Sequence, residues 1–178
     1  MFKHIAVRKR PGSVIEGIFD TGEIQFRCVL GKNGTNVLKR ESDGSTPAHR
    51  ILRPVSAYWR ADRLKARPSS QLPIKAIGAA DGWCDEPASP VYNMPIRLPF
   101  VGSHEEMKRE DCLYDVCIVL DWNMPPNRSR GRGSAIFLHV AKPGFPPTAG
   151  CIALARCDVL HILARLTSDT RITVLRQS

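Results

Sequence analysis

The sequence contains no apolar run long enough to cross a membrane. Its longest clean apolar runs, residues 116–120 and 135–138, have the length of β-strands, whereas a membrane-spanning helix needs about 20 apolar residues in succession. The N-terminal segment is charged and holds no apolar core of the kind that defines a secretory signal peptide. These features exclude an integral membrane protein, and they do not assign a compartment.

Patterns for metal binding and for serine hydrolysis are also missing. The six cysteines include no Cys-x-x-Cys pair, so we expect no structural zinc, no other metal and no cofactor. Cys28 alternates with apolar residues and Cys117 lies inside the run 116–120, which predicts that both are small core residues. A Gly-x-Ser-x-Gly elbow is absent, which argues against a Ser-His-Asp hydrolase.

Acidic side chains are the scarcer kind of charge. Twenty-six Lys and Arg residues face 17 Asp and Glu residues, for a formal net charge of +9. Such a balance favours acidic partners, among them nucleic acid, anionic lipid and cell-wall polymer. The basic residues are scattered, with short clusters at 8–10 and 128–132, and they form no basic helix. We therefore expect a solvated basic surface and no nucleic-acid binding.

The periodicity indicates a mainly β chain with one substantial helix. Strand patterns broken by turn residues occur at 14–19, 24–30, 116–120, 135–141 and 171–175. Residues 61–110 are rich in Pro and show little periodicity, which predicts long ordered loops with a few short strands. Apolar residues at helical spacing predict the one helix at 156–166. With no internal repeat, residues 1–178 are predicted to form a single domain.

The chemistry is concentrated in one segment, residues 134–154. His139 shares a strand face with Phe137 and Ala141, away from the more apolar face. Cys151 follows twelve residues later, directly after Gly150, and a loop of that length can return the chain to the histidine. An imidazole beside a thiol activates it as a nucleophile, and a glycine lets backbone N–H groups approach an oxyanion. A strand histidine bonded to a carbonyl, beside a structural cysteine, is the alternative interpretation.

This segment resembles the catalytic motif of the L,D-transpeptidase (YkuD-like) family, in which a strand histidine precedes a Ser/Thr-His-Gly-Cys stretch. The matching residues are His139, Thr148, Gly150, Cys151 and the apolar Ile152. The resemblance implies a catalytic role for Cys151, His139 and Gly150, a place near the substrate for Thr148, and a β-sandwich or barrel-like fold. Caspase-like and papain-like arrangements fit less well, because their local signatures are absent.

A second region extends the resemblance to about residues 3–176. Residues 31–34 and 43–47 resemble the family's early glycine turn and its Thr-Pro-x-Gly segment. The departures point to a compact, divergent branch: Ala149 and Ala153 stand where the family usually has a histidine and an Arg or Asn, and His49 replaces a glycine. Recognition of the donor peptide by the usual residues is therefore not expected.

Substrate recognition is predicted to come from other loops. The loops between residues 83 and 105 are dense in aromatic and polar side chains, which can line a peptide cleft or simply pack the loops. Arg156, beyond the cysteine, is a candidate cation. The predicted substrate-binding residues are Thr148, Trp83, Tyr92, Asn93, His104, Glu105 and Arg156.

The resemblance implies peptidoglycan L,D-transpeptidation through a cysteine thioester, hence a role in cell-wall biogenesis and cell shape. The expected partners are peptidoglycan stem peptides, with a carbapenem β-lactam as inhibitor, in the cell envelope or periplasm; the cytoplasm is the alternative. Two other functions stay open. One is a cysteine peptidase that trims stem peptides (an L,D-carboxypeptidase or amidase), with water as acceptor. The other is a non-catalytic basic binding domain.

Overall fold

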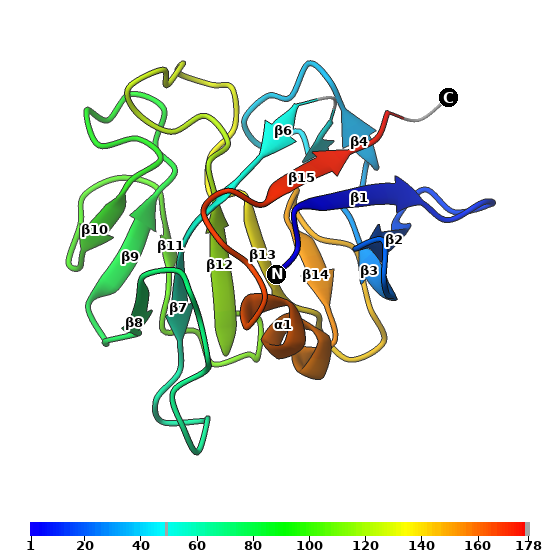
Figure 1. The fold of residues 1–178 in the computed structure, drawn as a ribbon. Helices are drawn as coiled ribbons and strands as arrows, with labels where there is room; N and C mark the ends of the chain where they lie inside the picture. The colour runs from blue at the N-terminus through cyan, green and yellow to red at the C-terminus, as the bar shows by residue number, and fades with distance from the viewer. Residues whose placement is uncertain (49, 177–178) are drawn as a thin grey trace.

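The computed structural model describes residues 1–48 and 50–176 and is built around one large, strongly curled sheet (Figure 1). Its strands follow the order β6-β15-β1-β2-β3-β14-β13-β12-β7-β8. The strands are β1 (His4–Lys9), β2 (Glu16–Asp20), β3 (Gln25–Val29), β6 (Ile51–Leu52), β7 (Pro54–Trp59), β8 (Ile74–Ala76), β12 (Val116–Leu120), β13 (Phe137–Val140), β14 (Ile152–Leu154) and β15 (Arg171–Val174).

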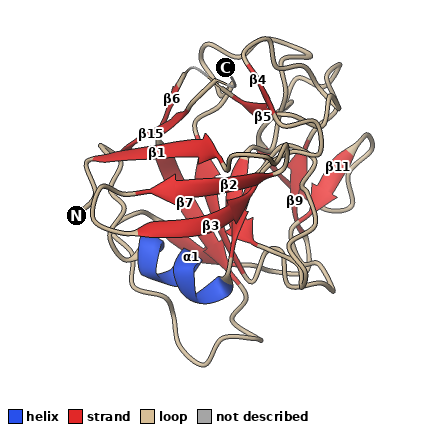
Figure 2. Cartoon of the chain, turned by 90° about the vertical axis from the view of Figure 1, so that its right-hand side faces the viewer, coloured by secondary structure: helices blue, strands red, loops and turns tan. Residues whose placement is uncertain are grey.

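Two smaller sheets accompany it. The first contains β9 (Asp81–Cys84) between β10 (Pro95–Arg97) and β11 (His104–Glu106). The second pairs β4 (Thr35–Asn36) with β5 (Thr46–Pro47). In Figure 2 the three-stranded sheet and the β4–β5 pair lie on the side of the main sheet away from the helix.

Helix α1 (Arg156–Leu163) packs on one face of the central strands β12 and β13. Val159, Ile162 and Leu163 turn their side chains into a core that includes Ile118 and Leu138. The acidic Asp158 lies in the first turn, where it suits the positive end of the helix dipole. We call this face of β12, β13 and β14 the helix face.

The opposite face of the same strands, which we call the small-sheet face, has a different composition. Cys117 and Phe137 point to it and form a separate cluster with Trp83 of β9 and with Tyr114. The Trp83 and Phe137 rings meet edge to face at 5.2 Å. The three-stranded sheet therefore covers the side of β13 that carries His139, since His139 and Phe137 are two residues apart on one strand.

The expectation of a mainly β fold with one helix near the C-terminus is confirmed. Strand 116–120 is reproduced to the residue, and it is buried on both faces as its continuous apolar run requires. The helix is shorter than the expected 156–166, because i→i−3 hydrogen bonds at Arg165 and Leu166 tighten its end. Among the described residues, no helix combines the length and apolarity needed to cross a membrane.

Candidate active site

Two parallel strands bring the predicted nucleophile and base onto one face. Strand β13 pairs with β14 in the register His139↔Ala153, and Cys151 lies directly before β14. The Phe137 N–H points at Cys151 Sγ at 3.4 Å, so Cys151 is level with Phe137. Partners in a parallel pair point to the same side, and two residues along a strand span about 7 Å. Cys151 is therefore a diagonal neighbour of His139 on the small-sheet face.

His139 is held as a neutral imidazole. Its side chain is 3% exposed, and Nδ1 lies 2.9 Å from the Val140 carbonyl oxygen. Because a carbonyl only accepts hydrogen bonds, Nδ1 carries the proton and Nε2 presents the lone pair. Burial lowers the pKa of His139 to about 4. The ring of Tyr114 stands edge-on to the imidazole at 5.6 Å, which restricts the tilt of the ring.

The Cys151 sulfur is bound by backbone groups at the start of β13. Its S–H donates to the Ala135 carbonyl oxygen at 3.1 Å, while Sγ accepts the Phe137 N–H. The residue is half-buried, and burial raises the pKa of the thiol to about 12. No hydrogen bond between Cys151 Sγ and the His139 ring occurs in the described part of the chain. The pair thus rests as a neutral thiol beside a neutral imidazole.

The backbone around Cys151 is tightly constrained. Thr148 Oγ1 donates to the Cys151 carbonyl oxygen at 2.7 Å and accepts the Gly150 N–H at 3.1 Å. Gly150 has a φ of +147°, and a Cβ there would lie 2.9 Å from the Ser45 carbonyl oxygen. Only glycine fits this position. Because the Gly150 N–H already donates to Thr148 Oγ1, the Cys151 N–H is the better candidate for holding an oxyanion.

The second block of the family resemblance packs against the first. Gly31 forms a parallel bridge with Thr148, and the Lys32 N–H donates to the Thr148 carbonyl oxygen at 2.9 Å. Thr46 Oγ1 accepts the Gly31 N–H at 2.8 Å and lies 3.4 Å from the Cys151 carbonyl oxygen. The glycine turn and the Thr-Pro segment therefore support the loop that carries Cys151. His49, which replaces the family's glycine, lies outside the described residues.

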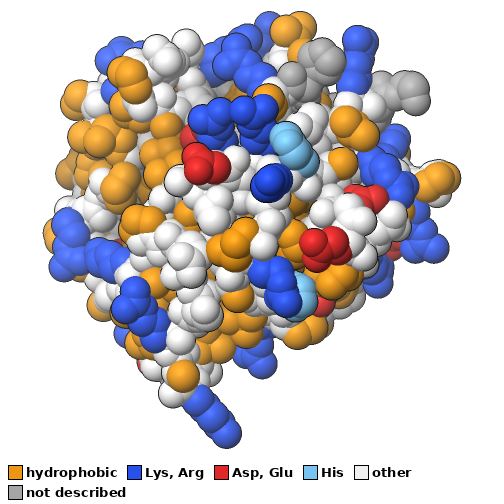
Figure 3. All heavy atoms as spheres, in the orientation of Figure 1, with side chains coloured by type: hydrophobic (Ala, Val, Ile, Leu, Met, Phe, Trp, Pro, Cys, Tyr) orange, Lys and Arg blue, Asp and Glu red, His pale blue; other side chains and the backbone are white. Residues whose placement is uncertain are grey.

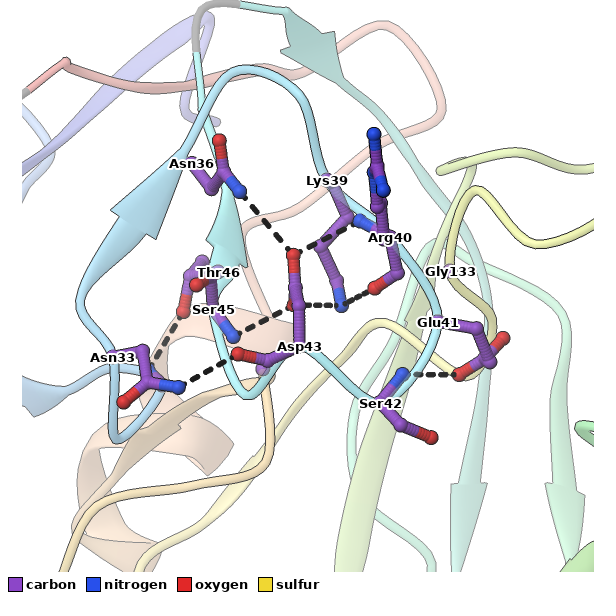
Figure 4. Close-up of polar contacts among 12 residues, drawn as sticks. Asn33, Asn36, Lys39, Arg40, Glu41, Ser42, Asp43, Ser45, Thr46 and Gly133 are labelled. Atoms are coloured by element: carbon purple, nitrogen blue, oxygen red, sulfur yellow. Dashed lines mark hydrogen bonds and ion pairs between the residues drawn. The ribbon is translucent and has the colours of Figure 1, made fainter.

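Asp43 organises this supporting loop (Figure 4). Its carboxylate accepts the Lys39 ammonium at 2.6 Å and the backbone N–H groups of Arg40 and Ser45, both at 2.9 Å. Burial works against the charge, yet these donors hold the pKa of Asp43 below its usual range. Lys39 is only 3% exposed, and its chain passes within 3.7 Å of the position of a Gly150 Cβ. Sequence reasoning missed this ion pair, although its aspartate belongs to the 43–47 block.

Tyr92 and Asn93, predicted to bind substrate, use their polar atoms inside the protein. Tyr92 is fully buried and its hydroxyl donates to Glu41. Asn93 Oδ1 accepts the Trp83 indole N–H and the Ala135 N–H, both at 3.0 Å. Its amide nitrogen donates to two carbonyl groups of the 122–123 segment at 2.9 Å. Asn93 thus holds Ala135, the residue whose carbonyl binds the Cys151 thiol.

Three other predicted substrate residues belong to the three-stranded sheet, Trp83 to β9 and His104 and Glu105 to β11. Trp83 is buried against Phe137 on the small-sheet face. Glu105 accepts the Tyr114 hydroxyl at 3.3 Å, and burial raises the pKa of its carboxyl. His104 points its Nδ1 at the Gly102 carbonyl oxygen at 2.8 Å.

Arg156, the predicted cation, contacts a carboxylate of the protein. It begins α1 and lies 3.5 Å from the Asp115 carboxylate, which also binds Arg63 at 3.0 Å. Its charge is therefore directed to Asp115. Across residues 1–48 and 50–176 there is no group of three or more side chains suited to hold a metal ion.

Comparison with known proteins identifies one family. Residues 14–174 match the model of the YkuD family, described as the L,D-transpeptidase catalytic domain. No curated protein and no solved structure matches the chain. The match spans both blocks of the resemblance and the segment from His139 to Cys151.

Proposed function

Because the chain belongs to the L,D-transpeptidase catalytic domain family, we propose that it cross-links peptidoglycan stem peptides with Cys151 as nucleophile and His139 as base. The observation that carries the proposal is the shared face of two neighbouring parallel strands. A half-buried thiol there lies diagonal to an imidazole whose Nδ1 is anchored on Val140. The proposed place of the reaction is the cell envelope, because the family's substrate is peptidoglycan.

The first half-reaction is acyl transfer to sulfur. Cys151 Sγ attacks the carbonyl carbon of a donor amide while His139 Nε2 accepts the thiol proton. A C–S bond forms, the C–N bond breaks, and the proton passes from Nε2 to the departing amine. The products are a thioester on Cys151 and the released C-terminal part of the donor.

The second half-reaction transfers the acyl group to an amine. The side-chain amine of a second stem peptide attacks the thioester carbon, and His139 Nε2 accepts a proton from that amine. The C–S bond breaks, and the Cys151 sulfur recovers its proton. In both steps the carbonyl oxygen becomes negative, and the Cys151 N–H is the proposed donor that stabilises it.

A neutral starting pair fits the electrostatics of the site. Burial raises the pKa of Cys151 to about 12 and lowers that of His139 to about 4, so the proton rests on sulfur. The thiol must leave the Ala135 carbonyl before Nε2 can accept its proton. Proton transfer therefore accompanies attack on the substrate and does not precede it.

Intact-mass spectrometry tests the proposal. Incubation with a stem tetrapeptide or a carbapenem should add one acyl group to the wild-type protein and none to the Cys151→Ala variant. Cys157 is the matched control, because it is an exposed thiol on α1. The Cys157→Ala variant should acylate at the wild-type rate. Acylation that persists in Cys151→Ala would refute the proposed nucleophile.

Product analysis decides the acceptor. The protein is incubated with purified sacculi, and the muropeptides released from them are analysed. Cross-linked dimers should form if an amine resolves the thioester. Trimmed monomers alone would make the protein an L,D-carboxypeptidase or amidase, because water would then be the acceptor. Binding to sacculi without any acylation would indicate a non-catalytic basic binding domain.

A further inference from the structure

A large groove lies beside the loop that leads into strand β13. It has a volume of about 860 Å³ and runs between segments 37–52 and 121–132. Its apolar lining includes Leu38 and Ile51, which are 64% and 50% exposed. Apolar and basic side chains lie next to each other on this part of the surface, near the top of the molecule in Figure 3.

The groove carries positive charge that the protein does not neutralise. Arg50 and Arg132 both line it and are exposed. Neither forms an ion pair with a carboxylate in the described residues. Arg50 places its guanidinium 5.9 Å from the Trp122 ring, which orients that cation along the groove wall. Two unpaired guanidinium groups at one groove suit an anionic ligand, because arginine binds carboxylates with paired donors.

The single carboxylate of the lining is already used. Asp121 accepts the Arg53 N–H at 2.7 Å. Burial also raises the pKa of Asp121, which disfavours its charged form. The groove therefore keeps a positive balance.

The groove and the candidate active site adjoin the same apolar cluster. Met124 lines the groove and packs against the cluster of Trp83, Cys117 and Phe137, against which Cys151 also packs. Arg132 precedes Ala135 by three residues, and the Ala135 carbonyl binds the Cys151 thiol. A peptide of three to four residues spans about 10–14 Å when extended, so the groove can serve the donor only if the sulfur lies within that span.

We propose that this groove binds the carboxylate-bearing part of the donor stem peptide, with Arg50 and Arg132 as its anion-recognition residues. The inference rests on the proposed function and deepens it. Ala149 and Ala153 are small and apolar beside the nucleophile, so they cannot bind a carboxylate. The groove supplies the missing charge together with an apolar wall for the stem's side chains. Tyr92 and Asn93 then serve to hold the loops.

Equilibrium binding tests the groove separately from catalysis. The Cys151→Ala protein should bind a stem tetrapeptide in calorimetry, and adding Arg50→Gln and Arg132→Gln should weaken that binding about 10- to 100-fold. The matched control is Arg130→Gln, because Arg130 is exposed on the same loop and lies outside the groove lining. It should bind like the parent. Amidating the peptide's carboxylates should weaken binding to the parent and leave the double variant unchanged.

Kinetics complete the test. In the protein with Cys151 intact, the double variant should raise KM for the tetrapeptide about 10-fold or more, with little change in kcat. Its alkylation by iodoacetamide should be unchanged, because that reagent needs no positioning.

The failures are distinguishable. Binding that ignores both arginines, or equal loss in Arg130→Gln, overturns the groove. Stronger binding of an oligonucleotide than of the peptide also overturns it. Normal arginine-dependent binding without acylation of Cys151 would instead overturn the proposed function alone.

Discussion

The two faces of strands β12, β13 and β14 differ in what they bury. The helix face presents Ile118, Leu138 and other aliphatic side chains to α1, and this cluster holds most of the core. The small-sheet face alternates with it residue by residue, yet presents Cys117, His139 and a phenylalanine to the three-stranded sheet. The helix face forms most of the apolar core, and the small-sheet face carries the candidate catalytic pair. The same strands serve both because side chains alternate along a strand.

The largest expected difference is between the effects of replacing Cys151 and replacing Cys28. Cys151→Ala should abolish acylation by stem peptide or carbapenem. Cys28→Ala should keep acylation but destabilise the protein by about 1–2 kcal/mol, because Cys28 is fully buried in the helix-face core. Burial raises the pKa of the Cys28 thiol to about 12, so it stays protonated and unreactive.

Intact mass and urea denaturation measure the two effects. Loss of acylation in Cys28→Ala without destabilisation would remove the distinction between the faces.

His139→Gln is expected to lower turnover about 10²–10³-fold at neutral pH, because the thiol loses the group that accepts its proton. Glutamine keeps a side chain that can bind the Val140 carbonyl, which limits the change in packing. The rate of iodoacetamide alkylation against pH gives an independent readout. The alkylation rate of His139→Gln should be lower than that of the wild type near pH 7. The two rates should converge at high pH, where hydroxide removes the thiol proton. An unchanged profile would mean that the two side chains do not meet.

Acid should destabilise the protein through the same histidine. The pKa of His139 is about 4 in the folded protein and near 6.5 when unfolded. A lowered pKa means that the unfolded chain binds the proton first, so stability is complete above pH 6.5 and declines down to about pH 4. The loss amounts to about 3 kcal/mol. Urea denaturation across this range should show a shallower decline in His139→Gln, and an equal decline would place the acid sensitivity elsewhere.

Asn93→Ala tests how far the loops of the small-sheet face support the nucleophile. It removes the acceptor for Ala135 N–H and Trp83 Nε1 and two donors to the 122–123 segment. We expect a destabilisation of about 2–4 kcal/mol and a several-fold loss in both peptide turnover and iodoacetamide reaction. A loss confined to peptide turnover would indicate direct contact between Asn93 and the substrate.

The sequence predicts the alternating strands well and the loops poorly. Strand 116–120 and the face of His139 follow from periodicity, which depends only on local geometry. Strand 135–141 begins two residues later than expected, at Phe137, because Ala135 has a φ of +50°. That conformation aims its carbonyl at the Cys151 sulfur. Nothing local to the residue signals it, since Asn93 imposes it from 42 residues away.

The candidate site likewise contains residues that the sequence pattern indicates and residues whose contacts depend on the tertiary fold. Motif and spacing lead to Cys151 and His139 as candidates, and the close backbone approach at Gly150 explains the glycine there. Asn93 looked like a substrate residue because it is polar and lies in a loop. Its partners are backbone groups from a distant segment, and no spacing reveals those. The Arg50–Arg132 groove depends equally on tertiary contact.

The smallest expected effect concerns Tyr114, which joins the faces of the two sheets. Its ring stands edge-on to both His139 and Phe137, at 5.6 and 5.7 Å, and its hydroxyl donates to Glu105 at 3.3 Å. Tyr114→Phe keeps the ring and removes one hydrogen bond, so turnover should change only about two- to threefold. Tyr114→Leu removes the ring as well and frees the imidazole to tilt.

The pH profile of alkylation separates the two roles of Tyr114. If the ring positions His139, Tyr114→Leu should lose the neutral-pH rate as His139→Gln does, whereas Tyr114→Phe should retain it. If the hydroxyl matters more through Glu105, both variants should show the same loss, because both lack it. The second outcome would shift the positioning role from the aromatic edge to the buried carboxyl, whose pKa burial raises. Either result identifies which part of the small-sheet face prepares the histidine to accept a proton.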